Sequence, residues 1–233
     1  MALPLYLAMT AAEMQANSAL PEKLSYMACH FSPYGAGLSN CPKALPEGAM
    51  LILNDRISCC KHDHRLITDQ LIDLIERFGC SCVLLDFQKP GVEEVAALAA
   101  KLSDTLPCSV GVSEHYAQKL DCPVFLPPLP LDIPIEDYLA PWQEREIWLD
   151  AAMDGVTLTL TEAGCTAVPL PYPTFEEGFR DEKLHCHYRI ETEPDIARFT
   201  LWRTWDDLQA LLTGAEAHGV TRAVGLWQEL HAR

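Results

Sequence analysis

The sequence predicts an α/β protein, a compact (β/α)8 TIM barrel with several short or missing helices. Three observations favour this class. Short apolar runs alternate loosely with stretches of helical periodicity, which is the pattern of a parallel sheet. Eight such runs can be counted, which is the number that closes this barrel. The length of 233 residues also suits one barrel, so we expect residues 1–233 to form a single domain.

Each expected strand is an apolar run that ends in polar residues or at a turn. The run 50–56 is apolar without alternation, as in a strand covered on both faces, and its last residues are polar. Apolar residues at helical spacing predict the next helix, and Gly79 predicts its end. Helices are expected at 11–20, 66–78, 92–106 and 205–218. Strands are expected near 3–9, 24–31, 50–56, 81–87, 109–113, 123–127, 146–152 and 223–229.

Residues 155–203 break this alternation. The run 156–161 alternates strictly between apolar and polar residues, which indicates a half-exposed antiparallel strand. The run 164–170 follows it as a hairpin mate, and 184–190 and 199–202 extend the β-rich region. We therefore expect a small antiparallel β insertion at about 155–203, between strands seven and eight of the barrel.

The net charge, the apolar runs and the cysteine content limit which partners and which cellular compartment we expect. The formal net charge of −16 argues against nucleic acid and anionic membranes, because both require a basic face. No apolar run approaches the ~20 residues that span a bilayer, and the first residues lack the basic start of an export signal. We expect a cytoplasmic protein whose ten cysteines are reduced, and no cofactor.

The fourth strand and its flanks carry a resemblance to a known family. The segment LIDLIERFGCSCVLLDFQKPGVEEVAALAAKL, residues 71–102, resembles the core of glycoside hydrolase family 18, the chitinase-like barrels, in their spore-associated bacterial branch. In that family the strand carries D-x-x-D-x-D-x-E, and DFQKP stands where D-W-E-x-P is expected. Residues 199–227 resemble the family's last helix and eighth strand. By this resemblance Trp227 takes the place of the Trp at the floor of the sugar site.

The departures from the family pattern decide the functional hypothesis. Gln88 stands where the family has its acid, and of the motif's carboxylates only Asp86 remains. An amide cannot give up a proton at neutral pH, so Gln88 cannot protonate a leaving group. We therefore expect a barrel that binds a small carbohydrate, an N-acetylglucosamine-type glycan, without the family's hydrolysis. Asp86 would orient the ligand, Gln88 would hydrogen-bond it, and Trp227 would form its apolar floor.

The first alternative is an active glycosidase with a displaced acid. Asp55, Glu114, Asp150 and Glu229 lie at or just past the expected C-terminal ends of strands, where barrel sites are built. Glu229 or Glu114 would then supply the acid, with Asp86 as its partner, and Asp55 would also line the site. Each of these acids can equally be an ordinary solvated loop residue.

The second alternative is a metal-dependent hydrolase that uses the Cys59–His64 loop. Cys59, His62 and His64 are of the residue types that Zn²⁺ prefers, but the loop lacks the Cys-x2-Cys spacing of structural sites. We therefore expect no metal, and we expect Asp63 to cap the helix that begins near Arg65. A barrel with a purely structural or partner-binding role is the remaining hypothesis.

Overall fold

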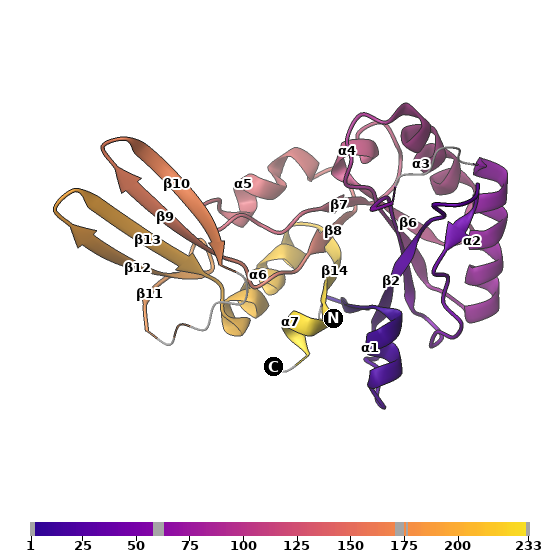
Figure 1. Cartoon of the computed structure of the whole chain (residues 1–233), viewed down its shortest axis with the longest axis horizontal. Helices are drawn as coiled ribbons and strands as arrows, with labels where there is room; N and C mark the ends of the chain where they lie inside the picture. Colours follow the sequence, from indigo (N-terminus) through magenta and orange to yellow (C-terminus); the bar gives the residue numbers. More distant parts are fainter. Residues whose placement is uncertain (1–2, 58–62, 171–174, 176, 232–233) are drawn as a thin grey trace.

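A computed structural model describes residues 3–57, 63–170, 175 and 177–231 (Figure 1). Its main feature is a closed barrel of eight parallel strands in the order β1-β14-β8-β7-β6-β5-β4-β2, which the pairing of β1 with β2 closes. The TIM-barrel prediction is therefore confirmed. The barrel strands are β1 (Leu5–Met9), β2 (Leu24–Phe31), β4 (Met50–Asn54), β5 (Cys82–Asp86), β6 (Ser109–Ser113), β7 (Val124–Leu126), β8 (Ile147–Asp150) and β14 (Val220–Leu226).

Most helices that accompany these strands are short, as expected. A strand of two residues, β3 (Leu38–Ser39), pairs antiparallel with the end of β2. The helices are α1 (Ala11–Ala16), α2 (His64–Phe78), α3 (Glu93–Thr105), α4 (Glu114–Ala117), α5 (Ile135–Leu139), the 3-10 helix Ala140–Trp142, α6 (Trp205–Ala217) and α7 (Trp227–Leu230). Among the residues that the structure describes, no helix has both the length and the apolar character that crossing a membrane requires.

The ends of α2 follow the signals in the sequence. The side chain of Asp63 accepts hydrogen bonds from the backbone N–H groups of Arg65 and Leu66, both at 3.0 Å. Gly79 closes the helix in the left-handed conformation with φ of 63°, which glycine adopts without strain. The predicted cap and stop of this helix are therefore confirmed.

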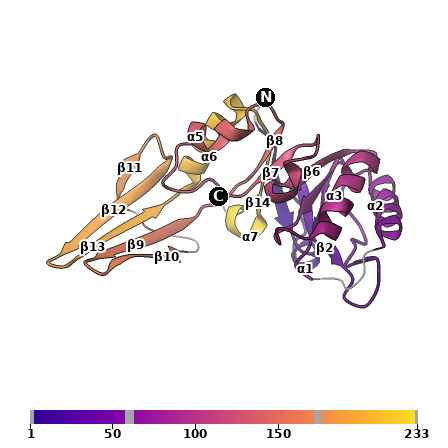
Figure 2. The ribbon, with the colours of Figure 1, turned by 90° about the horizontal axis from the view of Figure 1, so that it is seen from above.

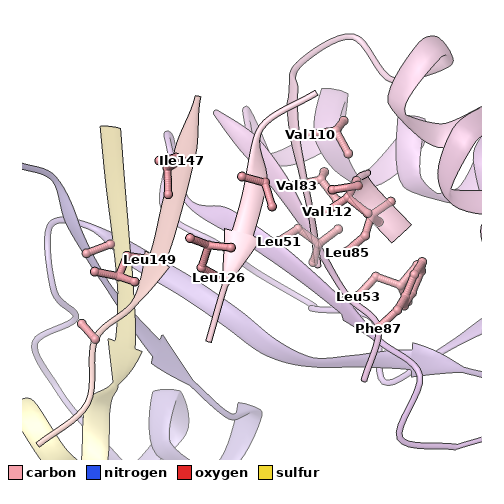
Figure 3. Close-up of a cluster of buried hydrophobic side chains, with 14 of the residues drawn as sticks. Leu51, Leu53, Val83, Leu85, Phe87, Val110, Val112, Leu126, Ile147 and Leu149 are labelled. Carbon is pink, nitrogen blue, oxygen red and sulfur yellow. The ribbon is translucent and has the colours of Figure 1, made fainter. Parts of the chain in front are cut away.

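Apolar side chains on both faces of the barrel strands explain the unbroken apolar runs. Ile52 and Leu84 point into the barrel, where Trp148 is fully buried. The alternate residues point outward against the helices, and Figure 3 shows part of this outer cluster. It includes Leu51, Leu53, Val83, Leu85, Phe87, Val110, Val112, Leu126, Ile147 and Leu149.

A five-stranded antiparallel sheet lies between β8 and β14 in the chain and projects from the barrel (Figures 1 and 2). We call it the β arm. Its strands run in the order β10-β9-β13-β12-β11, and the predicted insertion is confirmed. They are β9 (Gly155–Thr161), β10 (Gly164–Leu170), β11 (Phe179–Asp181), β12 (Cys186–Glu193) and β13 (Ile196–Trp202).

The end of the barrel differs from the expectation. The eighth strand was expected at 223–229, but β14 begins at Val220, which pairs with Ile147, and residues 227–230 form α7. This short helix folds back onto β14 because Gly225 has no side chain. A Cβ at Gly225 would lie 2.4 Å from Leu230 Cδ1. Trp227 is therefore a helical residue, not a strand residue.

Candidate functional site

A cavity of about 700 Å³ opens at the C-terminal ends of the barrel strands. That is the end where barrels of this kind build their sites. Its floor is apolar, and its rim holds most of the polar groups. The lining residues are Ala8, Met27, Ile52, Asn54, Asp55, Arg56, Leu84, Asp86, Gln88, Lys89, Phe125, Pro128, Asp150, Ala151, Ala152, Met153, Asp154, Val224, Gly225, Leu226 and Glu229.

Asp55 fixes the loop that carries Gln88. Its buried carboxylate accepts the backbone N–H of Gln88 at 2.9 Å and that of Lys89 at 3.0 Å. The Lys89 ammonium donates back to the Asp55 carbonyl at 3.1 Å. Two main-chain donors at the end of β5 are thus held by one side chain from the end of β4. Asp55 lines the cavity, and its hydrogen bonds give it a positioning role there.

Gln88 and Asp86 act as a pair. The Gln88 side-chain amide donates a hydrogen bond to the Asp86 carboxylate, and both residues line the cavity. Burial raises the pKa of Asp86, and the negative charge of Asp55 raises it further, while the Gln88 hydrogen bond lowers it. The pair therefore presents a carboxyl and an amide side by side on the cavity wall.

Asp150, at the end of β8, carries the most strongly shifted carboxyl of the cavity. Its pKa is raised to about 7, mostly by burial and further by the charges of Asp86, Asp154 and Glu229. A carboxyl with this pKa is protonated in a large fraction of molecules near neutral pH. The cavity therefore holds an acid that can donate a proton, although the residue in the family acid's place is an amide.

Glu229 also reaches the cavity, although it comes from α7 and not from a strand. Its buried carboxylate accepts the backbone N–H of Met153. Burial raises its pKa, the Met153 hydrogen bond lowers it, and the charge of Asp154 raises it further. The bond to Met153 holds the segment after β8 in place.

Glu114 lies elsewhere. It is the first residue of α4 and is not among the residues that line the cavity. Its negative charge acts on Tyr138, whose pKa is raised first by burial and then by Glu114 and Asp150. The structure thus brings Asp86, Gln88, Asp55 and Glu229 together and leaves Glu114 outside.

Trp227 does not form the floor of this cavity. It begins α7, packs against the outer apolar cluster and stacks on His231 with ring centroids 4.5 Å apart. Trp227 and Glu229 both lie on α7, and their side chains diverge because residues two apart point to different sides of a helix. The apolar floor comes instead from residues such as Phe125 and Leu84.

The proposed metal ligands are only partly described. Cys59 and His62 lie outside the described residues, and His64 is the first residue of α2. Within the described ranges no group of three or more His, Cys, Asp or Glu residues is arranged to hold a metal ion. The alternative of a metal-dependent hydrolase stays a prediction.

Asp154 is a cavity residue that the sequence did not single out. It follows β8 by four residues, lines the cavity, and adds to the pKa rise of both Asp150 and Glu229. The only signal available was its position shortly after an expected strand end. Asn54 is a second cavity residue that the sequence pattern does not indicate. Its side-chain amide donates hydrogen bonds to the carbonyls of Met27 and Cys29 at 3.1 and 3.0 Å.

Comparison by sequence finds no matching family model and no matching curated protein. Comparison by structure finds clear relatives in fold. A mutant GH18 chitinase from Cycas revoluta in complex with (GlcNAc)4 is 13% identical, with a TM-score of 0.60 over 96% of this chain and 94% of that chain. A chitinase from Chromobacterium violaceum is 9% identical, with a TM-score of 0.58 over 96% and 93% of the two chains.

A third similar structure is the spore cortex-lytic enzyme SleL of Bacillus cereus. It is 12% identical, with a TM-score of 0.55 over 96% of this chain and 70% of that chain. Sequence identities as low as these three support a similarity of fold alone. The eight-stranded barrel with its arm is therefore the fold of the chitinase-like proteins of glycoside hydrolase family 18.

Proposed function

We propose that the protein binds an N-acetylglucosamine-type glycan in the cavity at the barrel mouth and does not hydrolyse it by the route of family 18. The observation that carries this proposal is the Gln88–Asp86 pair on the cavity wall. The family route needs a carboxylic acid at the position that Gln88 occupies. An amide there can donate and accept hydrogen bonds but cannot transfer a proton.

The shape and lining of the cavity support a sugar ligand. Its volume of about 700 Å³ lies in the range of small-molecule sites. Apolar side chains such as Phe125 form the floor, and carboxyl and amide groups surround it. This combination suits a sugar, which has apolar ring faces and hydroxyl and amide groups at its edge. The Cycas revoluta structure holds (GlcNAc)4 in a barrel of the same fold.

The test is a calorimetric titration of the full chain with the tetramer of N-acetylglucosamine, followed by mass spectrometry of the glycan. We expect binding and an intact tetramer. Gln88→Ala should weaken binding by roughly tenfold, the equivalent of about one hydrogen bond. Gln209→Ala is the matched control, because Gln209 is an exposed residue of α6 outside the cavity. No binding by the wild type would overturn the proposal.

A second candidate function is glycoside hydrolysis with Asp150 as the acid. The observation that favours it is the Asp150 pKa of about 7, which keeps a proton available at neutral pH. Asp150 would take this role in place of Glu229, which is held by a backbone N–H, and of Glu114, which lies outside the cavity.

The two functions are separated by turnover of a chromogenic β-N-acetylglucosaminide. Hydrolysis by Asp150 requires its protonated form, so turnover should fall as the pH rises through about 7. It should vanish in Asp150→Asn and persist in Asp206→Asn, because Asp206 is an exposed residue of α6. Turnover with this pattern replaces the binding proposal. A wild type that binds the tetramer and gives no turnover between pH 5 and 8 rejects the second function.

A further inference from the structure

The β arm has one face that is apolar and one that is polar. In β9, β12 and β13 the residues Leu158, Ile190 and Phe199 are opposite one another, and so are Val156, Tyr188 and Leu201 in the next row. Because successive side chains of a strand point to opposite faces, all of these lie on the same face. We call it the apolar face.

The charged residues of these strands lie on the other face. Arg189 forms an ion pair with Glu191 at 3.3 Å, and Arg198 forms one with Glu193 at 2.6 Å. All four alternate with the apolar set along β12 and β13. In the described strands of the arm the one charged residue that shares the parity of the apolar face is Asp181. Its carboxylate accepts the N–H groups of Lys183 and Leu184 in a turn at the corner of the sheet.

The two faces also differ in what covers them. On the polar face, Trp202 lies against Phe175 with ring centroids 5.0 Å apart, and His187 is bonded to Asp207 of α6 at 2.7 Å. On the apolar face the described residues cover the base, where residues 128–132 and the sheet enclose a groove of about 450 Å³. Farther out, Ile190 is 49% exposed and Phe179 is 68% exposed. An apolar sheet face of this width is unusual on a monomer.

We propose that the apolar face is the contact surface of a homodimer, in which the arms of two copies of this chain pack face to face. The arm projects from the barrel (Figures 1 and 2), so its face is presented beyond the body of the molecule. Two sheets that bury apolar faces against each other form an aligned sandwich. Each copy presents the same patch, as a twofold axis requires.

The area of the apolar face is large enough for contact with a second copy of the chain. The strands are spaced about 4.8 Å apart and advance about 3.3 Å per residue, so the whole sheet covers on the order of 500 Å², of which residues 128–132 already cover the base. The open parts of two such faces therefore come to somewhat less than about 1,000 Å² as flat areas. Side chains stand out from the sheet and make the accessible area larger than the flat area, which brings the contact to the size at which specific interfaces begin.

The charge distribution favours a second copy as well. The partner must present a flat surface as free of charge as this one, because an unpaired charge buried in the contact is costly. The arm of a second copy meets that requirement. A face-to-face dimer also leaves the ion pairs of Arg189 and Arg198 in water, so the large negative charge of each chain stays outside the contact.

The first test is the mass of the full chain in solution, measured by sedimentation equilibrium from about 1 to about 200 µM, a range that detects micromolar association. We expect the mass to rise from that of the 25.9 kDa chain to twice that value. A chain that remains monomeric over the whole range overturns the proposal, whatever other partner the face then has.

A matched pair of variants locates the contact. Ile190→Glu places a charge on the apolar face, and Val168→Glu adds the same charge to a similarly exposed residue, at 56%, on the opposite face. Because a twofold axis repeats each change, Ile190→Glu should weaken the dimer by more than about tenfold, and Val168→Glu by less than about twofold. Equal effects of the two variants would place the contact elsewhere and overturn the proposal.

A measurement on the wild type covers the case in which Ile190→Glu does not fold. Cys165 is exposed and lies opposite Leu160 at the edge of the apolar face. Its alkylation, followed by peptide mass mapping, should slow as the dimer forms. An unchanged rate across a monomer–dimer transition would show that the apolar face stays open, and would reject the proposal.

Discussion

Burial and the negative charge of Asp86 at the same barrel mouth are the two largest causes that raise the pKa of Asp150 to about 7. The two residues end different barrel strands, β8 and β5, which β7 and β6 separate in the sheet, and both line the cavity because the sheet curves into a barrel. Asp154 and Glu229 contribute in the same direction. Four carboxyl groups around one cavity therefore cannot all ionise at neutral pH without cost, and Asp150 is the one that is protonated in a large fraction of molecules there.

The first prediction concerns stability against pH. A carboxyl whose pKa is higher in the folded chain than in the unfolded chain loses folding stability as the pH rises between the two values, here from about 4 to about 7. Asp150→Asn removes this loss. At pH 8 we expect the variant to be more stable than the wild type by about 2 kcal/mol, after allowing for water in the cavity, and the gain to vanish near pH 4.

Urea unfolding followed by circular dichroism at several pH values measures this difference. Asp206→Asn changes the same group on the exposed side of α6 and should leave the pH dependence as it is in the wild type. A gain for Asp150→Asn that is the same at pH 4 and pH 8 would contradict the assigned pKa.

The second prediction concerns the interior of the barrel. Gly111 lies beside Trp148, and a Cβ at Gly111 would be 2.2 Å from the indole ring. Gly111→Ala should therefore overpack the interior and lower the free energy of unfolding by about 1–3 kcal/mol. Gly35→Ala is the control, since its Cβ would come no closer than 3.7 Å to Ser32 Oγ. Thermal unfolding compares the two variants, and equal melting temperatures would refute the packing argument.

The barrel could be predicted from the sequence because its strands are buried on both faces. Ile52 faces the interior with Trp148, and its neighbours Leu51 and Leu53 face the helices, so the strand appears as one apolar run. The arm could be predicted because Leu158 and Thr159 alternate, as expected of a sheet with one exposed face. Both patterns arise from residues that are neighbours in the chain, so they can be recognised in a single sequence.

The boundary of the last strand could not be predicted. Trp227 and Leu230 are apolar and extend the run that begins at Val220. The pairing of Val220 with Ile147 sets the start of the strand, and the close contact of Leu230 with Gly225 accompanies its end. Both depend on residues brought together by the fold, and neither leaves a periodic signal in the sequence.

The candidate site was predictable in position but not in chemistry. The family resemblance pointed to Asp86 and Gln88, and a strand end pointed to Asp55; all three line the cavity. The raised pKa of Asp150 depends on burial and on charges from Asp86, Asp154 and Glu229, which are spread along the chain from residue 86 to residue 229. Sequence spacing carries no information on such a sum of distant charges.

The third prediction separates Trp227 from the ligand site. Its ring packs against the outer cluster and His231, outside the cavity. Trp227→Ala should lower the free energy of unfolding by roughly 2 kcal/mol through lost packing. It should change the affinity for the N-acetylglucosamine tetramer by less than about twofold, or roughly 0.4 kcal/mol. Trp227→Phe should recover most of the stability. A large loss of affinity in a folded Trp227→Ala chain would return this residue to the site.

The last prediction concerns the joint between the β arm and α6. The fully buried carboxylate of Asp207 accepts hydrogen bonds from Arg180 at 3.0 Å, His187 at 2.7 Å, and the N–H and hydroxyl of Thr204 at 3.0 and 2.7 Å. Burial alone would raise its pKa, but the bonds from Thr204 and His187 outweigh burial and lower it.

Because the folded chain holds Asp207 at a lowered pKa, the stabilisation is complete at neutral pH and is lost as the pH falls below about 4. Asp207→Asn should therefore cost about 2–4 kcal/mol at pH 7, since it replaces a buried carboxylate that accepts from Arg180, His187 and Thr204 with a neutral amide, and much less at pH 3. Asp206→Asn, one residue earlier and exposed, should cost less than about 0.5 kcal/mol at either pH. Urea unfolding at the two pH values tests this, and a loss that does not shrink at pH 3 would mean that packing, not the charge of Asp207, holds the arm to α6.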